Sequence, residues 1–349
     1  MSSQKFSGGG MVEHLHVKSG EEQHHIKSKT LNSKNGNHSK TGDYENRKQG
    51  PQKPLEKIGN VANPYTHEFL MDCADYILTR TNLRPKIAII CGSGLGSLAE
   101  SLDEKMDFPY EDIPHFPQST VPGHAGKLVI GKMGTVPVVC MQGRFHYYEG
   151  YPLWKCAMPV RVFKLLGVEL MVVTNAAGGI HQDFKVGDIM IIKDHVNFPG
   201  IGGESTLRGP NDDKFGPRFI AMNKAYDLEL RKLGKQVASE LGMSNFFHEG
   251  VYSMVGGPSF ETVTELRLMK LLGVDAVGMS TVPEVVAARH CDIKCFGFSL
   301  ITNECIMEYD NEDEANHEEV MENANKRAND LVQFTSAFVT SAAQHLGFE

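Results

Sequence analysis

Short, continuously apolar runs recur along this chain, and each of them ends in glycine and small polar residues. A run that is apolar at every position predicts a strand buried on both faces, because a half-exposed strand alternates apolar with polar residues. The predicted strands span residues 87–91, 136–141, 170–174, 189–192, 251–255, 275–279 and 295–302. Helical spacing appears between several of them, so the sequence predicts an α/β fold with a mixed, mostly buried sheet.

Helices are predicted from apolar residues three or four positions apart. The first is expected to open at Asn63-Pro64, with Asn63 as its N-cap, and its apolar stripe is Phe69, Cys73 and Ile77. A second helix is expected to end at Gly242, with a stripe formed by Met222, Tyr226, Leu230, Leu233, Val237 and Leu241. The last helix is predicted over residues 313–344.

Charge divides the 349 residues into two parts. Residues 1–60 hold 10 Lys and Arg against 6 Asp and Glu, whereas residues 61–349 hold 25 against 37. The first part has no apolar periodicity, so we predict a disordered polar tail over 1–60 and one catalytic domain over 61–349. Five histidines in the tail leave a metal-binding or interaction role as the alternative.

The composition excludes several classes of protein. A net charge of −8 argues against general nucleic-acid binding, and no apolar run is long enough to cross a membrane. No secretory signal is evident, and the seven cysteines lack CxxC spacing. We therefore expect a cytoplasmic protein with reduced, mostly buried thiols and without a metal site.

Three loops favour an anion. Residues 91–97, CGSGLGS, follow one predicted strand and precede a helix, so glycine backbone, the Ser93 hydroxyl and the helix start could hold phosphate. Arg144 and His146 alternate after another strand and should point the same way. Ser280 opens a helix, where Thr281 and Glu284 have the spacing of a capping box. A plain tight turn, a surface ion pair and simple capping remain the alternatives.

Other loops favour a polar heterocycle. Phe260 offers a stacking face and Glu261 an acceptor, just before a helix that Thr262 and Glu265 should cap. Asn303 ends a strand and can donate and accept at once. Each feature alone also fits ordinary turn chemistry. Ligands gather at the ends of buried strands in α/β sheets, so together the loops predict a site for phosphate and a polar heterocycle.

These residues, in this order, resemble the purine nucleoside phosphorylases of the low-molecular-mass, trimeric type. The resemblance covers about residues 61–349. Its motifs are CGSGLG at 91–96, VPGHAG at 121–126, MQGRFHYYEGYPLWK at 141–155, VTNAAGG at 173–179, GDIM at 187–190, RGPND at 208–212, GPSFETVTE at 257–265, VGMSTVPEV at 277–285 and FGFSLITN at 296–303.

The resemblance implies a single domain with a partly barrel-like central sheet surrounded by helices. It implies reversible phosphorolysis of purine (deoxy)ribonucleosides, chiefly inosine and guanosine, to the base and (deoxy)ribose 1-phosphate in purine salvage. Phosphate would be a co-substrate, and no cofactor would be needed. The enzyme would be a homotrimer in which Phe219 completes the neighbouring site.

The family's site residues map onto matching positions of this sequence. Phosphate would be bound by Ser93, His124, Arg144, His146, the Ala176 backbone and Ser280. The nucleoside would be bound by Tyr148, Phe219, Phe260, Glu261, Met279, Asn303 and His317. The residues expected to matter most in catalysis are Asn303, Glu261, His317 and His146.

One position departs from the family pattern. Glu304 stands after Asn303 where a lysine is frequent, which removes a positive charge beside the base. Because Asn303 and Glu261 are intact, 6-oxopurines are still expected to be the better substrates. The alternatives are a methylthioadenosine phosphorylase, in which Asp would replace Asn303, a nucleoside hydrolase, and a catalytically silent nucleoside-binding protein.

Overall fold

The computed structural model describes residues 65–348, except 93–95 and 121–124. The predicted tail over 1–60, Ser93 and His124 therefore lie outside the described residues. Among those that are described, no helix is both long and apolar enough to cross a membrane.

The described residues build a nine-stranded mixed sheet in the order β2-β3-β4-β1-β5-β8-β7-β6-β9. The strands are β1 (Ile87–Cys91), β2 (Asp103–Pro109), β3 (Lys127–Met133), β4 (Val136–Gln142), β5 (Leu170–Gly179), β6 (Ile189–Asn197), β7 (Phe247–Met254), β8 (Ala276–Gly278) and β9 (Lys294–Glu304). A further pairing between β5 and β9 closes the last five strands on themselves. The expected α/β domain with a partly barrel-like sheet is confirmed.

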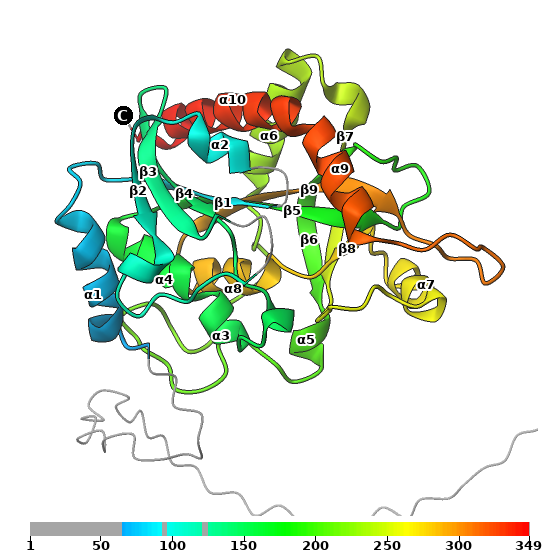
Figure 1. Cartoon of the computed structure of the whole chain (residues 1–349), viewed down its shortest axis with the longest axis horizontal. Helices are drawn as coiled ribbons and strands as arrows, with labels where there is room; N and C mark the ends of the chain where they lie inside the picture. Colours follow the sequence, from blue (N-terminus) through cyan, green and yellow to red (C-terminus); the bar gives the residue numbers. More distant parts are fainter. Residues whose placement is uncertain (1–64, 93–95, 121–124, 349) are drawn as a thin grey trace, which may run out of the picture. The chain divides into compact units, whose positions relative to one another are not determined.

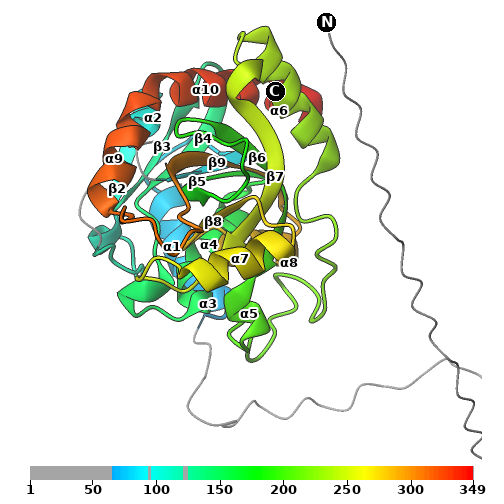
Figure 2. The same cartoon turned by 90° about the vertical axis from the view of Figure 1, so that its right-hand side faces the viewer.

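Helices cover both faces of this sheet. They are α1 (His67–Leu78), α2 (Gly96–Glu100), α3 (Leu153–Cys156), α4 (Met158–Leu166), α5 (Phe198–Ile201), α6 (Leu228–Glu240), α7 (Val263–Leu271), α8 (Val282–His290), α9 (His317–Lys326) and α10 (Ala328–Leu346), with 3₁₀ turns at Tyr110–Asp112, Tyr147–Glu149 and Ser244–Phe246. Figure 1 shows α2, α6 and α10 on one side and α1, α3, α4 and α8 on the other, and Figure 2 agrees. Each side buries its own apolar cluster against the sheet.

All seven predicted strands are present, and several extend further than predicted. β5 continues from Thr174 to Gly179 because its small residues pack closely against β9. Two strands were not predicted: β2 is an edge strand with mostly exposed residues, and β3 pairs with it. β2 buries little and so carries no apolar run, which is why the pattern failed there. β3 is mostly buried, but its apolar run covers only residues 128–130.

Three helix boundaries were predicted wrongly. The first helix begins at His67, and its N-cap is Thr66, whose hydroxyl accepts from the Phe69 amide at 3.2 Å. The second begins only at Leu228, because Asp227 caps it and Met222 and Tyr226 lie in the preceding loop. The predicted last helix begins at His317, not at residue 313, and is divided at Arg327 into α9 and α10.

Candidate active site

One cavity of about 480 Å³ lies where the ends of β5, β8 and β9 meet the loop after β4. Ten of the predicted site residues line it: Arg144, His146, Tyr148, Ala176, Phe260, Glu261, Met279, Ser280, Asn303 and His317. They come from segments as distant in sequence as residues 144 and 317. The closed part of the sheet therefore brings the predicted anion-binding and heterocycle-binding groups to the same place.

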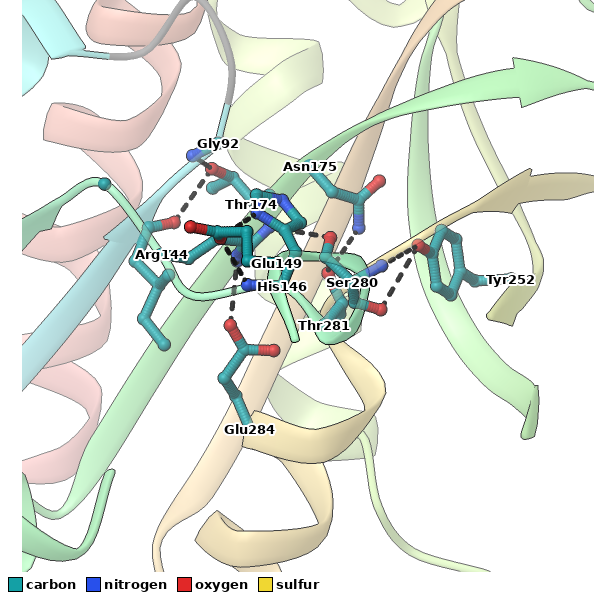
Figure 3. A network of polar contacts seen from close by, with 12 residues as sticks. Gly92, Arg144, His146, Glu149, Thr174, Asn175, Tyr252, Ser280, Thr281 and Glu284 are labelled. Carbon is teal, nitrogen blue, oxygen red and sulfur yellow. Dashed lines mark hydrogen bonds and ion pairs between the residues drawn. The ribbon is translucent and has the colours of Figure 1, made fainter. Parts of the chain in front are cut away.

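Arg144 is buried at one end of this cavity and its guanidinium is held from three directions. Nε donates to Glu284 Oε1 at 3.0 Å, and both side chains are only 3% exposed. Nη1 donates to the Thr174 carbonyl at 2.7 Å and to Ser280 Oγ at 3.0 Å. Figure 3 shows these partners around the arginine. The alternative interpretation of Arg144, a surface ion pair, is thus excluded, because both partners are buried.

The turn between β8 and α8 places Ser280 beside that arginine. Thr281 has a φ of 76°, a left-handed conformation that is rare for a β-branched residue. Its hydroxyl does not cap α8 but accepts from Asn175 Nδ2 at 2.9 Å. The predicted capping box of Thr281 and Glu284 is therefore wrong, because the left-handed turn directs Thr281 to β5 and Glu284 to Arg144. Tyr252 fixes the same turn through its hydroxyl, which accepts from the Ser280 amide at 3.3 Å.

His146 is oriented by Glu149, which the sequence analysis did not select. Glu149 Oε1 accepts from the His146 amide at 2.7 Å and lies 3.1 Å from His146 Nδ1. The other carboxylate oxygen accepts from the amide and hydroxyl of Thr120 at 2.8 and 2.6 Å. Burial alone would raise the pKa of Glu149, but the bonds from His146 and Thr120 outweigh it and lower the pKa to about 2. The carboxylate therefore holds a proton on Nδ1 and selects one tautomer of the ring.

Glu261, Phe260 and Asn303 line another part of the cavity. Burial, with a smaller contribution from Glu265, raises the pKa of Glu261 above its usual value. Asn303 is 7% exposed, and its Oδ1 accepts from the Thr302 hydroxyl at 3.3 Å. A poorly solvated carboxylate beside an amide suits a ligand edge that presents both donors and acceptors.

The glycines of β5 allow this close approach. A Cβ added at Gly178 would lie 2.7 Å from Cys305 Sγ and 3.2 Å from Asn303 Nδ2. At Gly92, which follows β1, an added Cβ would lie 2.8 Å from the Asn175 backbone. The small residues at these strand ends therefore let neighbouring strands pack closely beside the cavity.

His317 lines the cavity from the first turn of α9. The side chain of Asn316 caps this helix by accepting from the Glu319 amide at 2.8 Å. Thr262 and Glu265 cap α7 reciprocally, as predicted, and this fixes the end of the loop that carries Phe260 and Glu261.

Not every predicted residue meets the cavity. Phe219 lies in the loop between α5 and α6, is 90% exposed and does not contribute to the lining. Glu304 is exposed and lines an adjoining acidic cavity of about 650 Å³, which shares Asn303 with the first. No group of three or more His, Cys, Asp and Glu in the described part of the chain could hold a metal ion. The seven cysteines are free, and all but Cys305 are buried.

Of two further residues at the site, only Glu149 has a signal in the sequence. Glu149 stands three positions after His146, the spacing of the reciprocal cap that the structure contains. Glu284 has the sequence spacing of a capping residue, and only the left-handed conformation of Thr281 reveals its pairing with Arg144.

Comparison with known proteins gives a consistent result. The family profile of the Phosphorylase superfamily matches residues 86–340. The purine nucleoside phosphorylase of Bos taurus is 55% identical over 281 residues, covering 80% of this chain and 97% of the relative. A Schistosoma mansoni purine nucleoside phosphorylase solved with inosine is 46% identical with a TM-score of 0.76, covering 78% of this chain and 96% of that one. A schistosome purine nucleoside phosphorylase solved with hypoxanthine has the same identity and TM-score and covers 78% and 97%. With its family profile, its fold and its cavity in agreement, the chain belongs to the purine nucleoside phosphorylase family.

Proposed function

We propose that this protein catalyses the reversible phosphorolysis of purine (deoxy)ribonucleosides, chiefly inosine and guanosine. The products are the free purine and (deoxy)ribose 1-phosphate, as in purine salvage. The observation that carries the proposal is the cavity itself, in which Arg144 and Ser280 lie with Glu261 and Asn303. A phosphate and a purine could therefore occupy it together, with the ribose between them.

Phosphate is assigned to the end of the cavity that contains Arg144. A buried guanidinium, the Ser280 hydroxyl at the start of α8 and the Ala176 backbone are suitable groups for a tetrahedral anion. His146, held by Glu149, adds a ring nitrogen in one tautomer. Ser93 and His124, which lie outside the described residues, are assigned to the same end from the resemblance.

The chemistry follows from where charge develops. As the bond between ribose and purine breaks, the ribosyl carbon becomes cationic and the leaving base becomes anionic. Phosphate stabilises the cation and then bonds to that carbon. Hydrogen bonds that strengthen on the leaving base lower the barrier more than bonds that only hold the substrate.

Glu261 and Asn303 are assigned to the leaving base. The N1–H of a 6-oxopurine can donate to the Glu261 carboxylate, while the Asn303 amide can bond the O6 and N7 edge. Adenine carries no hydrogen on N1, so it would leave the buried carboxylate without that partner, which favours inosine and guanosine. Phe260 would pack on the base.

The remaining assignments complete the site. Tyr148, Met279 and His317 would hold the ribose, with His317 at the 5′-hydroxyl. Phe219 is exposed here and would enter the site of the next subunit in a homotrimer. The reaction needs no cofactor because phosphate is the nucleophile, and we place the enzyme in the cytoplasm.

One assay tests the function against its alternatives. Inosine, adenosine and methylthioadenosine are each incubated with and without phosphate, and base release is measured. We expect phosphate-dependent cleavage, fastest with inosine. Cleavage without phosphate would indicate a hydrolase, preference for methylthioadenosine the related phosphorylase, and no cleavage a binding protein.

Asn303→Asp extends that assay to the residue that reads the base. An ionised Asp cannot donate to N7 and O6 but can accept from a 6-amino group. We expect the ratio of kcat/KM for adenosine over inosine to rise at least tenfold. An unchanged ratio would show that Asn303 does not read the purine.

A further inference from the structure

Glu284, the buried partner of Arg144, has no role in the assignments above. Glu284 does not line the cavity, but its side chain is only 3% exposed and is bonded to Arg144, which does line it. Burying two charges costs several kcal/mol for each ion, and such a pair often adds no net stability. A contribution to folding alone is therefore a weak reason for this carboxylate to be here.

The hydrogen bonds of the guanidinium indicate a different reason. Nε is bonded to Glu284, and Nη1 to Thr174 and Ser280. Nη2 is buried and has no hydrogen-bond partner within the described part of the chain. A buried donor without a partner costs about 1–3 kcal/mol. The three bonds thus fix the plane of the guanidinium and leave one nitrogen to meet a bound acceptor.

Two of those bonds come from the start of α8. Ser280 lies just before the helix and Glu284 in its first turn, and both bond the guanidinium of Arg144. The left-handed Thr281 between them, bonded to Asn175, fixes where this turn begins. Figure 3 shows Ser280, Thr281 and Glu284 grouped around Arg144. The start of α8 therefore holds the arginine in one orientation.

We propose that Glu284 is a positioning residue for phosphate, acting through Arg144. It holds the guanidinium so that Nη2 faces the anion, and its negative charge offsets the positive charge of the arginine. The second effect weakens phosphate binding enough for the phosphorylated product to leave. This inference rests on the proposed function, because it takes phosphate as the anion.

Two substitutions separate orientation from charge. Glu284→Gln keeps an oxygen acceptor for Nε but removes the charge, so we expect the KM for phosphate to fall roughly tenfold. The kcat should fall too, because ribose 1-phosphate leaves more slowly. Glu284→Ala removes the acceptor and frees the guanidinium, so the KM for phosphate should rise at least tenfold. In both variants the KM for inosine, measured at saturating phosphate, should change less than about twofold.

Glu249→Gln is the matched control. Glu249 also bonds an arginine, Arg231, and a lysine, Lys235, but it does not line the cavity. We expect both KM values to stay as in the unsubstituted enzyme.

A calorimetric titration of the enzyme with inorganic phosphate, in the absence of nucleoside, measures phosphate affinity directly and provides a second readout. Binding should be tighter in Glu284→Gln and weaker in Glu284→Ala. If Glu284→Ala does not fold, the sign of the Gln effect still decides. Unchanged phosphate affinity in Glu284→Gln, or equal changes for phosphate and inosine, would overturn the inference. An unsubstituted enzyme that binds phosphate but does not cleave inosine would instead refute the proposed function.

Discussion

Glu261 combines two effects of burial in one side chain. Its raised pKa means that ionisation costs folding free energy. This cost is absent below the unfolded value near 4.5, grows as the pH rises above it, and is complete once the pH exceeds the folded-state pKa. The same poor solvation makes the carboxylate a strong acceptor for a donor on the ligand. A residue that costs stability in the empty enzyme would thus contribute to catalysis.

Glu261→Gln tests both effects together. We expect kcat/KM for inosine to fall about a hundredfold, as for the loss of one transition-state hydrogen bond. The ligand-free variant should unfold at a higher urea concentration than the unsubstituted enzyme at pH 7. This gain should shrink as the pH falls through the folded-state pKa, because the unsubstituted carboxyl is then protonated.

Glu265→Gln is the control for the stability measurement, since Glu265 caps α7 and does not line the cavity. That variant should be no more stable than the unsubstituted enzyme. A Glu261→Gln variant that is both fully active and less stable would contradict the assignment of Glu261.

At the scale of elements, the turn Tyr147–Glu149 links the two segments that hold His146 and Thr120. With its pKa lowered to about 2, Glu149 stabilises the fold above pH 4.5, and this contribution disappears as the pH falls towards 2. Glu149→Gln tests this contribution, because it leaves the donors of Thr120 and His146 with a poorer acceptor. We expect a loss of about 1–3 kcal/mol in the free energy of unfolding at pH 7. In urea titrations the difference from the unsubstituted enzyme should narrow below pH 4.5, and a pH-independent difference would show that charge is not involved.

The elements also show which signals a sequence contains. Buried strands such as β1 were predicted to the residue, because every position is apolar and both neighbours are parallel strands. The mostly exposed β2 left no such signal. Met222 and Tyr226 fit a helical spacing but pack as loop residues ahead of α6, so spacing alone overestimated that helix.

The site was predicted better by chemistry than by local conformation. Ten residues chosen for their functional groups meet in one cavity. The pairing of Arg144 with Glu284 joins residues 140 positions apart and depends on the left-handed Thr281. A non-glycine residue in that conformation is held by its tertiary contacts, which no short sequence window contains.

At the scale of the whole molecule, the pairing of β5 with β9 closes the sheet and sets the ends of β5, β8 and β9 around the cavity. Phe219 alone among the described site residues lies outside it, on a loop anchored by Asn211, which bonds His290 Nε2 at 2.9 Å and the Gly216 carbonyl at 2.9 Å. An exposed phenylalanine on a loop anchored in this way is what the proposed sharing of sites between subunits would require.

Complementation between two impaired variants tests this sharing. Phe219→Ala keeps a complete cavity but cannot supply the phenylalanine, whereas Asn303→Ala supplies the phenylalanine but has an impaired cavity. Each variant alone should lose at least tenfold in kcat/KM for inosine. After the two are mixed, unfolded and refolded together, about a quarter of the sites in random trimers combine an intact cavity with a neighbouring Phe219. Activity should therefore return to about a quarter of that of the unsubstituted enzyme, whereas activity no higher than the mean of the two variants would show that each subunit works alone.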